Sequence, residues 1–255
     1  MLAWGCSTAP TIEEVPSAEG YYQRGLELLE GERVFLFFRD VNYPRAIELF
    51  QEVIDNYPYS EYATLAELKT ADIYFKQVRY EEAASYYQDF VELHPSHPEV
   101  PYAIYRHGLC SFEQMRGMDQ DQTPTQQAIA QFRVLLDRYP NSEYAEAARE
   151  RLAAAVDHLA GHDIEVGNFY YQRGDYHAAV RRYRQALESY PEHSTHVLTL
   201  VRLGRSLMLM GLYDEAEQIY QLAIAERPEE RIDEDLRDQL TEFGLKLSEA
   251  RQDGR

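Results

Sequence analysis

The sequence predicts an all-α protein, a right-handed superhelical solenoid of five helical hairpins plus a C-terminal capping helix. The main observation is a pattern of residues that recurs five times along the chain, starting at Tyr43, Tyr80, Thr125, Tyr176 and Tyr213. The second is the composition, because 255 residues with 45% hydrophobic and 27% charged side chains are enough to bury a core.

Each copy of the pattern has the spacing of one helix face. A small alanine is followed by an aromatic residue four positions on, an apolar residue three beyond that and a proline five further. The alanines are Ala46, Ala83, Ala128, Ala179 and Ala216. Positions i, i+4 and i+7 lie on one side of an α-helix, and proline ends a helix because its ring interrupts the hydrogen-bond ladder. Each copy therefore predicts the second helix of a hairpin.

The first helices of the hairpins carry a small residue followed three positions later by a larger one. Examples are Ala71 with Tyr74, Gly167 with Tyr170 and Gly204 with Leu207. Small residues at these positions let two helices approach closely. The combined pattern resembles the tetratricopeptide repeat, a helical hairpin of about 34 residues. We therefore expect five tetratricopeptide-like hairpins.

Departures from the repeat length locate insertions. Residues Met115–Pro124 contain Gly, Asp and Pro and predict a loop in the third unit. Residues Ser142–Gln172 lack proline and predict a single long helix in the fourth unit. The first unit carries an extra segment rich in Phe and Val, Arg33–Val41. After the last hairpin, Ile232–Arg251 predicts an amphipathic helix that caps the end of the solenoid.

The charge balance excludes some classes of function. Asp and Glu number 44 against 25 Lys and Arg, which gives a net charge of −19. Nucleic-acid binding needs a basic face, so it is excluded. An anionic membrane surface is disfavoured unless a covalent group holds the chain there. No apolar run approaches the roughly 20 residues that a membrane-spanning helix needs.

The sequence contains no motif typical of an enzyme. Nucleophile-elbow, phosphate-loop and zinc-protease patterns are all missing. His158 and His162 stand four residues apart beside Asp157 and Asp163, a spacing that can bind a metal, but no third ligand is indicated. Cys110 lies among apolar residues and is expected to be a packed thiol. We therefore expect no catalytic residue, no cofactor and no metal.

Cys6 has a different setting. It follows a glycine and precedes a short polar linker, which is typical of the cysteine after a bacterial lipoprotein signal. Ala3 stands where such signals usually have Leu, and the positive and apolar regions of a signal are missing. Position alone leaves two interpretations open: a lipid anchor or an exposed thiol near the terminus.

The sequence has 21 tyrosines, and their placement leaves a second ambiguity. Tyr74, Tyr102 and Tyr105 belong to first helices, which line the concave side of such a solenoid. Tyrosine suits the binding of an extended peptide because it offers a large contact area, few rotatable bonds and a polar tip. The alternative is packing between repeats, which we expect of most tyrosines.

Three stretches carry a more specific resemblance. They are LHPSHPEVPYAIYRHGL at 93–109, YPNSEYA at 139–145 running on to Leu152, and HDIEVGNFYYQRGDYHAA at 162–179 followed by two arginines. Together with the Cys6 tether, the five hairpins and the long helix, they resemble the BamD (YfiO) family. Members of that family are lipoprotein subunits of the outer-membrane β-barrel assembly (BAM) machinery. The resemblance covers about residues 6–228.

The resemblance implies a scaffold or adaptor and no enzyme, held at the periplasmic face of the outer membrane by a lipid on Cys6. In that family the N-terminal hairpins bind unfolded outer-membrane proteins. The C-terminal hairpins dock on a POTRA domain of BamA, the barrel subunit, and accessory BAM lipoproteins are further candidate partners. The family's docking arginine aligns with Arg182, next to Arg181, and an arginine suits this task because its planar fork binds carboxylates.

For the substrate-peptide groove the resemblance gives only a region. The candidates, chosen by concave placement, are Tyr74, Tyr102, Tyr105 and Arg106. The implied organisation is a tether at 1–17, substrate-recognition repeats at 18–141, BamA-docking repeats at 142–228, and a capping helix and tail at 229–255.

Two other functions remain open at this point. One is a soluble periplasmic tetratricopeptide adaptor of another envelope process, such as cell division. The other is a repeat domain that supports a hydrolase site through His158 and His162.

Overall fold

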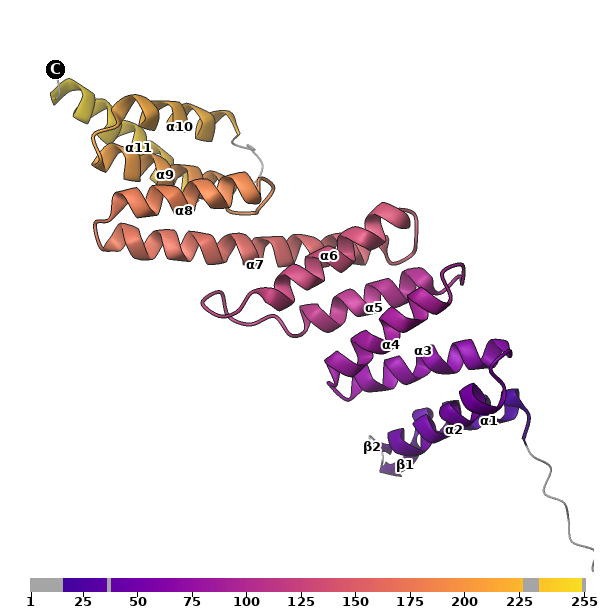
Figure 1. Ribbon diagram of the computed structural model, residues 1–255. Coiled ribbons are helices and arrows are strands. Elements are labelled where there is room, and N and C mark those ends of the chain that lie inside the picture. Colours follow the sequence, from indigo (N-terminus) through magenta and orange to yellow (C-terminus); the bar gives the residue numbers. More distant parts are fainter. Residues whose placement is uncertain (1–15, 36–37, 227–233, 254–255) are drawn as a thin grey trace, which may run out of the picture. The chain divides into compact units, whose positions relative to one another are not determined.

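The computed structural model describes residues 16–35, 38–226 and 234–253 (Figure 1). Within these ranges the chain forms the helices α1 to α11 and one two-stranded sheet. Contacts divide it into two compact units, one ending at Ala103 and the other beginning at Ile104, so the boundary falls inside α5. The division into functional halves expected from the sequence is a different one and stays a prediction.

In its described part, the first unit contains four whole helices in two hairpins, followed by the first turn of α5. The four helices are α1 (Ala18–Glu30), α2 (Tyr43–Asn56), α3 (Glu61–Lys76) and α4 (Tyr80–Leu93). Consecutive helices pack on one another, and α1 also contacts α3. Side chains cap the first three: oxygens of Ser17, Asn42 and Ser60 accept backbone N–H groups in the first turns, which satisfies donors that the helix itself leaves free.

A small antiparallel sheet connects α1 to α2. Strand β1 (Glu32–Phe35) pairs with β2 (Phe38–Asp40), with Glu32 opposite Asp40. This is where the sequence shows the extra segment Arg33–Val41, so an otherwise all-helical architecture carries one β-hairpin there. Phe and Val favour extended backbone, and Gly31, with φ of 71°, supplies the left-handed conformation at which α1 ends.

The second unit contains the remaining helices. They are most of α5 (Val100–Phe112), α6 (Thr123–Arg138), α7 (Ala145–Gln172), α8 (Tyr176–Ser189), α9 (His196–Leu209), α10 (Tyr213–Ala225) and α11 (Glu234–Asp253). From α6 onward each helix packs on the next, and α11 also contacts α9. Figure 1 shows α7 as the long helix of the series. The sequence predicts this helix over Ser142–Gln172; it ends at Gln172 as predicted but begins three residues later, at Ala145, and has 28 residues. The predicted loop lies between α5 and α6.

The residues that define the repeat pattern are the ones that pack between the helices. All five pattern alanines are fully buried, and the aromatic residue four positions later is buried in the first four hairpins. The helices approach closely at glycines: a Cβ atom built on Gly167 would lie 2.6 Å from the ring of Tyr183. Gly25 meets Phe50 in the same way. The five predicted second helices are α2, α4, α6, α8 and α10, and the tetratricopeptide-like fold class is confirmed.

Helix α11 is the predicted cap. Its Leu240, Phe243 and Leu247 are buried against α9 and α10. The ring of Phe243 occupies the space beside Gly204, where three earlier hairpins, at Gly25, Gly108 and Gly167, place an aromatic residue of their own second helix. The aromatic residue of α10, Tyr220, instead packs on Gly244 of the cap. Ile232 and Pro228, also named in the sequence pattern, lie outside the described residues.

Candidate binding surfaces

Helix α8 carries three arginines with different surroundings. Arg184 forms a salt bridge of 2.7 Å with Glu215 of α10. Arg182 forms one of 3.3 Å with Asp163 of α7 and donates a second hydrogen bond to Gln185. Arg181 is exposed and makes no salt bridge with any residue that the structure describes. Of the two arginines expected at the docking site, Arg181 is thus free and Arg182 is held from within the chain.

Asp163 fixes the position of Arg182. The carboxylate side chain is 7% exposed, whereas the Arg182 side chain is 40% exposed. Burial raises the pKa of Asp163, and the nearby positive charge of Arg182 opposes that rise only in part. Since one Nη group of Arg182 is used on Asp163 and Gln185, its other donors remain available toward solvent.

Tyr74 lies on α3 in an aromatic and cationic cluster. Its ring is 5.2 Å from that of Tyr86, and the guanidinium of Arg79 stands 4.5 Å above it. Burial, followed by the interaction with Tyr74, raises the pKa of Tyr86. Tyr74 is half-buried, so part of its surface can contact a partner.

Tyr102 forms a hydrogen bond with a buried carboxylate of the first unit. Its hydroxyl donates to Asp72 at 2.6 Å, and the hydroxyl of buried Tyr87 donates to the same oxygen at 2.6 Å. Lys69 approaches the other carboxylate oxygen at 3.2 Å. Asp72, 8% exposed, is therefore the centre of a network that joins α3, α4 and the start of α5.

Tyr105 and Arg106 belong to the second unit. The ring of Tyr105 stacks on Tyr144 with 5.7 Å between centroids and also contacts Phe132. Arg106 is half-buried, and its positive charge acts on Cys110. The four groove candidates are thus divided between the two units, with Tyr74 and Tyr102 in the first and Tyr105 and Arg106 in the second.

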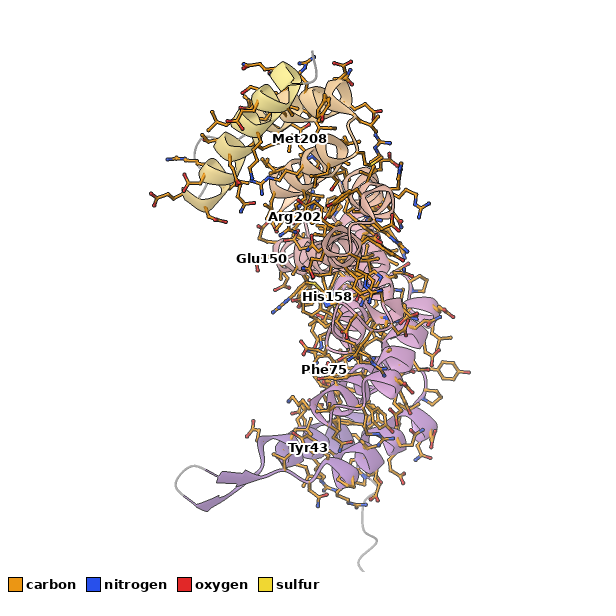
Figure 2. All side chains as sticks on the ribbon, turned by 90° about the vertical axis from the view of Figure 1, so that its left-hand side faces the viewer. Tyr43, Phe75, Glu150, His158, Arg202 and Met208 are labelled. Carbon is orange, nitrogen blue, oxygen red and sulfur yellow. The ribbon has the colours of Figure 1, made fainter. Side chains whose placement is uncertain are left out.

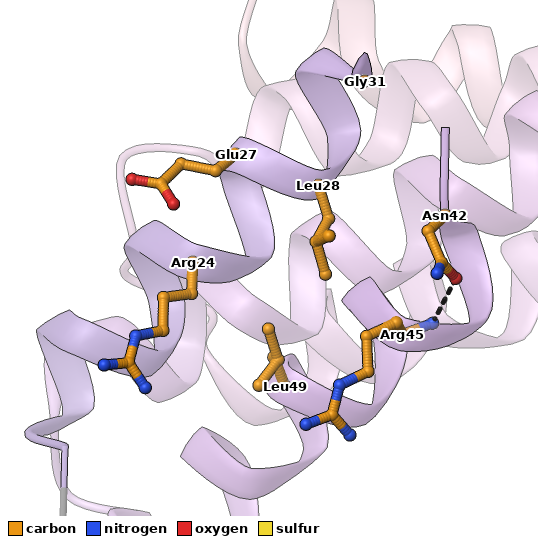
Figure 3. Close-up of a pocket in the computed structure, with 7 residues that line it drawn as sticks. All are labelled: Arg24, Glu27, Leu28, Gly31, Asn42, Arg45 and Leu49. Atoms are coloured by element: carbon orange, nitrogen blue, oxygen red, sulfur yellow. Dashed lines mark hydrogen bonds between the residues drawn. The ribbon is translucent and has the colours of Figure 1, made fainter. Parts of the chain in front are cut away.

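The first unit contains a polar cavity of about 770 Å³ between α1 and α2 (Figure 3). Figure 3 shows Arg24 and Arg45 on its two sides, with Leu28 and Leu49 between them. The Arg45 side chain also pairs with Glu48 at 2.6 Å. Neither Tyr74 nor Tyr102 lines this cavity, so the sequence-based candidates and the cavity are separate features.

His158, His162 and Cys110 each lie among side chains or backbone groups that do not form a metal site in the described part of the chain. Figure 2 shows His158 on α7, where its Nδ1 is buried without a hydrogen bond to any described residue. His162 bonds through Nδ1 with the backbone carbonyl of Met118, in the loop before α6. In the described part of the chain no three His, Cys, Asp or Glu side chains gather as metal ligands. Burial raises the pKa of Cys110 to about 12, which keeps its thiol protonated.

Cys6, expected to carry a lipid, lies outside the described residues. Among the helices that the structure describes, none combines the length and apolar character needed to cross a bilayer.

Sequence reasoning missed three features that involve contacts between distant residues. Asp72 and Asp163 organise side chains 15 or more residues away, and nothing in the local sequence identifies these contacts. A cavity on α7, lined in part by Arg133 and Arg149, was not anticipated either. In each case the feature depends on how neighbouring helices are aligned in three dimensions, and no sequence motif marks it.

Comparison with known proteins gives a family match over most of the chain. The family model described as "YfiO: Outer membrane lipoprotein" matches residues 35–222. Two similar relatives are both described as outer membrane protein assembly factor BamD. The protein from Caulobacter vibrioides is 32% identical over 198 residues, which cover 78% of this chain and 65% of that protein. The protein from Vibrio cholerae is 28% identical over 232 residues, covering 87% and 92%.

Among solved structures, the chain is similar to the TPR2AB domain of yeast Sti1, with 16% identity, a TM-score of 0.42 and coverage of 83% of this chain and 78% of that one. The chain spans just under two thirds of the length of the Caulobacter relative.

Proposed function

Because this chain belongs to the YfiO family of outer membrane lipoproteins, we propose that it is a lipid-anchored scaffold of the machinery that assembles outer membrane proteins. The observation that carries the proposal is the family match over residues 35–222, together with relatives that are described as assembly factors. The proposal assigns no catalysis to the chain. Its work is to bind two kinds of partner at once.

The second unit, through α8, is the proposed docking surface for a POTRA domain of BamA. Arg181 projects into solvent without a salt bridge to the described residues, and Arg182 is held in one orientation by Asp163. An arginine whose orientation is already fixed loses little conformational entropy when it binds a carboxylate. This arrangement supports α8 as a docking surface for an acidic group on the partner.

The N-terminal hairpins are the proposed binding region for unfolded outer-membrane proteins. Tyr74 supports this because its half-buried ring, packed against the tilted ring of Tyr86 and under the guanidinium of Arg79, offers a rigid aromatic surface. Tyr102 contributes its ring only, since its hydroxyl is used on Asp72. Two or more acyl chains on Cys6 would give stable attachment to the membrane, at about 0.8 kcal/mol for each buried CH₂ group.

The experiment is a pull-down from detergent-solubilised envelope with mass spectrometry of the bound proteins. The wild-type chain is expected to retain a large β-barrel protein with POTRA domains. Arg181→Glu is expected to reduce this retention at least about fivefold, because it reverses a charge at the interface. Arg182→Gln tests the second arginine without placing a carboxylate beside the buried Asp163.

The matched control is Arg237→Glu, which makes the same charge change at an exposed position of α11. It is expected to leave retention unchanged. Loss of the barrel protein in all three variants would point to net charge and not to α8, and retention in both α8 variants would remove α8 from the interface. If the wild-type chain retains no POTRA-containing protein, the proposed function itself is wrong.

A further inference from the structure

Helix α7 is twice as long as the helix that packs on its second half. It has 28 residues and α8 has 14, which correspond to about 42 Å and about 21 Å of helix. Helix α8 contacts the C-terminal half of α7, where Tyr183 packs on Gly167 and Arg182 on Asp163. The turn after α8 reaches α7 at Asp157, whose carboxylate accepts the backbone N–H of Ser194 at 2.7 Å.

The face of α7 that α8 covers continues beyond that point. Helical periodicity places Arg149, Leu152, Ala153 and Val156 at i, i+3, i+4 and i+7, in line with the positions that α8 covers further along. These four residues, which we call the α7 ledge, line a cavity of about 500 Å³. Ala153 is exposed, and Leu152 and Val156 are only half-buried.

The walls of this cavity come from both sides of the ledge. Arg133 of α6 forms one side, and the turn at the end of α8, with Tyr190, Pro191 and Glu192, forms the other. Leu152 and Val156 pack in part against a small core of Ile129 of α6 with Ala155 and Leu159, so α6 covers the ledge from one side only and leaves Ala153 exposed. The floor is thus apolar and stays open within the described part of the chain.

Two positive charges border this apolar floor in a chain whose net charge is −19. Arg133 is exposed and makes no salt bridge with a described residue. Arg149 is held at the ledge by Glu146 at 2.8 Å and by the backbone carbonyl of Pro140. Glu192 is the only acidic residue among those that line the cavity. A ligand that fits the floor and this charge carries apolar side chains next to a carboxylate.

We propose that the α7 ledge is the binding site for an amphipathic helix from a partner protein. Its apolar side chains pack on Leu152, Ala153 and Val156, in line with α8, and its acidic side chains pair with Arg133 and Arg149. A helix is favoured over an extended segment because the same face of α7 already accepts α8 by helix packing. The site is separate from the arginines of α8 assigned to docking, and it does not depend on the proposed function.

The test uses a photoreactive side chain, p-benzoylphenylalanine, in the full chain expressed in its native cells. One variant carries it at Ala153 on the ledge, and the matched control carries it at Ala154, which is also exposed but points about 100° away around the helix. We expect irradiation to give one discrete protein adduct at position 153, at least about fivefold stronger than at 154. Peptide mass spectrometry then identifies the crosslinked segment.

The charge part of the proposal is tested in the same assay. Replacing both arginines, Arg133→Gln with Arg149→Gln, is expected to weaken the adduct at least about fivefold, because the partner's carboxylates lose their counter-charges. Circular dichroism and thermal unfolding of this double variant check that it folds. A synthetic peptide of the identified segment should bind the purified chain in fluorescence anisotropy, and a Glu→Lys change in the peptide should restore binding to Arg133→Glu.

Several outcomes would overturn the proposal. One is equal adducts, or none, at Ala153 and Ala154. Another is an adduct that does not respond to the loss of the two arginines in a folded variant. A crosslinked segment without helical apolar spacing and acidic residues, a segment of this same chain, or a lipid would also contradict it.

Discussion

Tyr102 shows how one side chain can be both a binding candidate and part of the packing. Its ring is half-buried on the first turn of α5, while its hydroxyl donates to buried Asp72 beside that of Tyr87. Hydrogen bonds to a buried carboxylate contribute more than bonds between neutral groups. The hydroxyl of Tyr102 therefore contributes to stability, whatever its ring contacts.

Replacing Tyr102 by Phe keeps the ring and removes the donor. We expect Tyr102→Phe to lower the free energy of unfolding by about 1–2 kcal/mol, measured by urea unfolding. Tyr87→Phe should have a similar effect, and the two effects should not add, because both hydroxyls bond the same carboxylate oxygen. Tyr59→Phe is the control, since Tyr59 is fully exposed and should show no change. Equal stability of the Tyr102 and Tyr59 variants would contradict the proposed role of the network.

At the scale of the element, α11 completes the last hairpin. Phe243 is fully buried and fills the space beside Gly204, and Tyr220 meets its ring edge-on at 5.3 Å. A terminal repeat without such a cover would expose the apolar face of α9 and α10. The cap thus supplies the aromatic side chain that the hairpins of α1 and α2, α5 and α6, and α7 and α8 each supply from their own second helix.

Removing the Phe243 ring leaves a cavity between α9, α10 and α11. Phe243→Ala is expected to cost about 3–5 kcal/mol of stability. Hydrogen exchange should increase in α9 and α10 and stay unchanged in the first unit. The control in the same helix is Leu245→Ala, whose side chain is 60% exposed and whose loss should change stability by less than about 0.5 kcal/mol. Unchanged exchange in α9 and α10 after Phe243→Ala would show that α11 does not stabilise them.

The elements that were predictable from the sequence are those set by local periodicity. The second helices, the 28-residue α7 and the cap all follow from apolar spacing, because a helix buries one face wherever it packs. The hairpin of β1 and β2 was not predicted, since the segment Arg33–Val41 is too short to show a period. Membership of the family was predictable from the order of the motifs, and the family match over residues 35–222 confirms it.

The candidate sites were less predictable than the fold. That Arg182 contacts Asp163 depends on how far α8 is offset along α7, which involves residues 19 positions apart. The α7 ledge depends on where α8 ends relative to α7, and Tyr102 on the position of Asp72 in another helix. No local pattern encodes such offsets, because they result from the packing of whole helices.

At the scale of the whole molecule, two effects on folding stability oppose each other as the pH falls: the net negative charge decreases, and histidines with lowered pKa values become protonated. Protonation reduces the net charge of −19 and therefore the self-repulsion of the folded chain. His107 and His193 act in the other direction, since burial lowers the pKa of both. His193 is 3% exposed and bonds to Thr199 and to the Tyr190 carbonyl. At moderate salt the self-repulsion is screened, so the histidines with lowered pKa values should determine the trend.

We therefore expect stability to fall between pH 7.5 and pH 5.5. A histidine whose folded pKa lies below its ordinary value of 6.5 stays neutral in the native state while the unfolded chain takes up the proton, so its contribution is lost as the pH falls through 6.5. The raised pKa of Asp163 acts in the opposite sense, but starts from an ordinary value of 3.8, farther from this window. The measurement is urea unfolding at both pH values in 0.3 M salt. His107→Gln should reduce the difference and exposed His177→Gln should not; equal or greater stability of the wild-type chain at pH 5.5 would contradict the assignment.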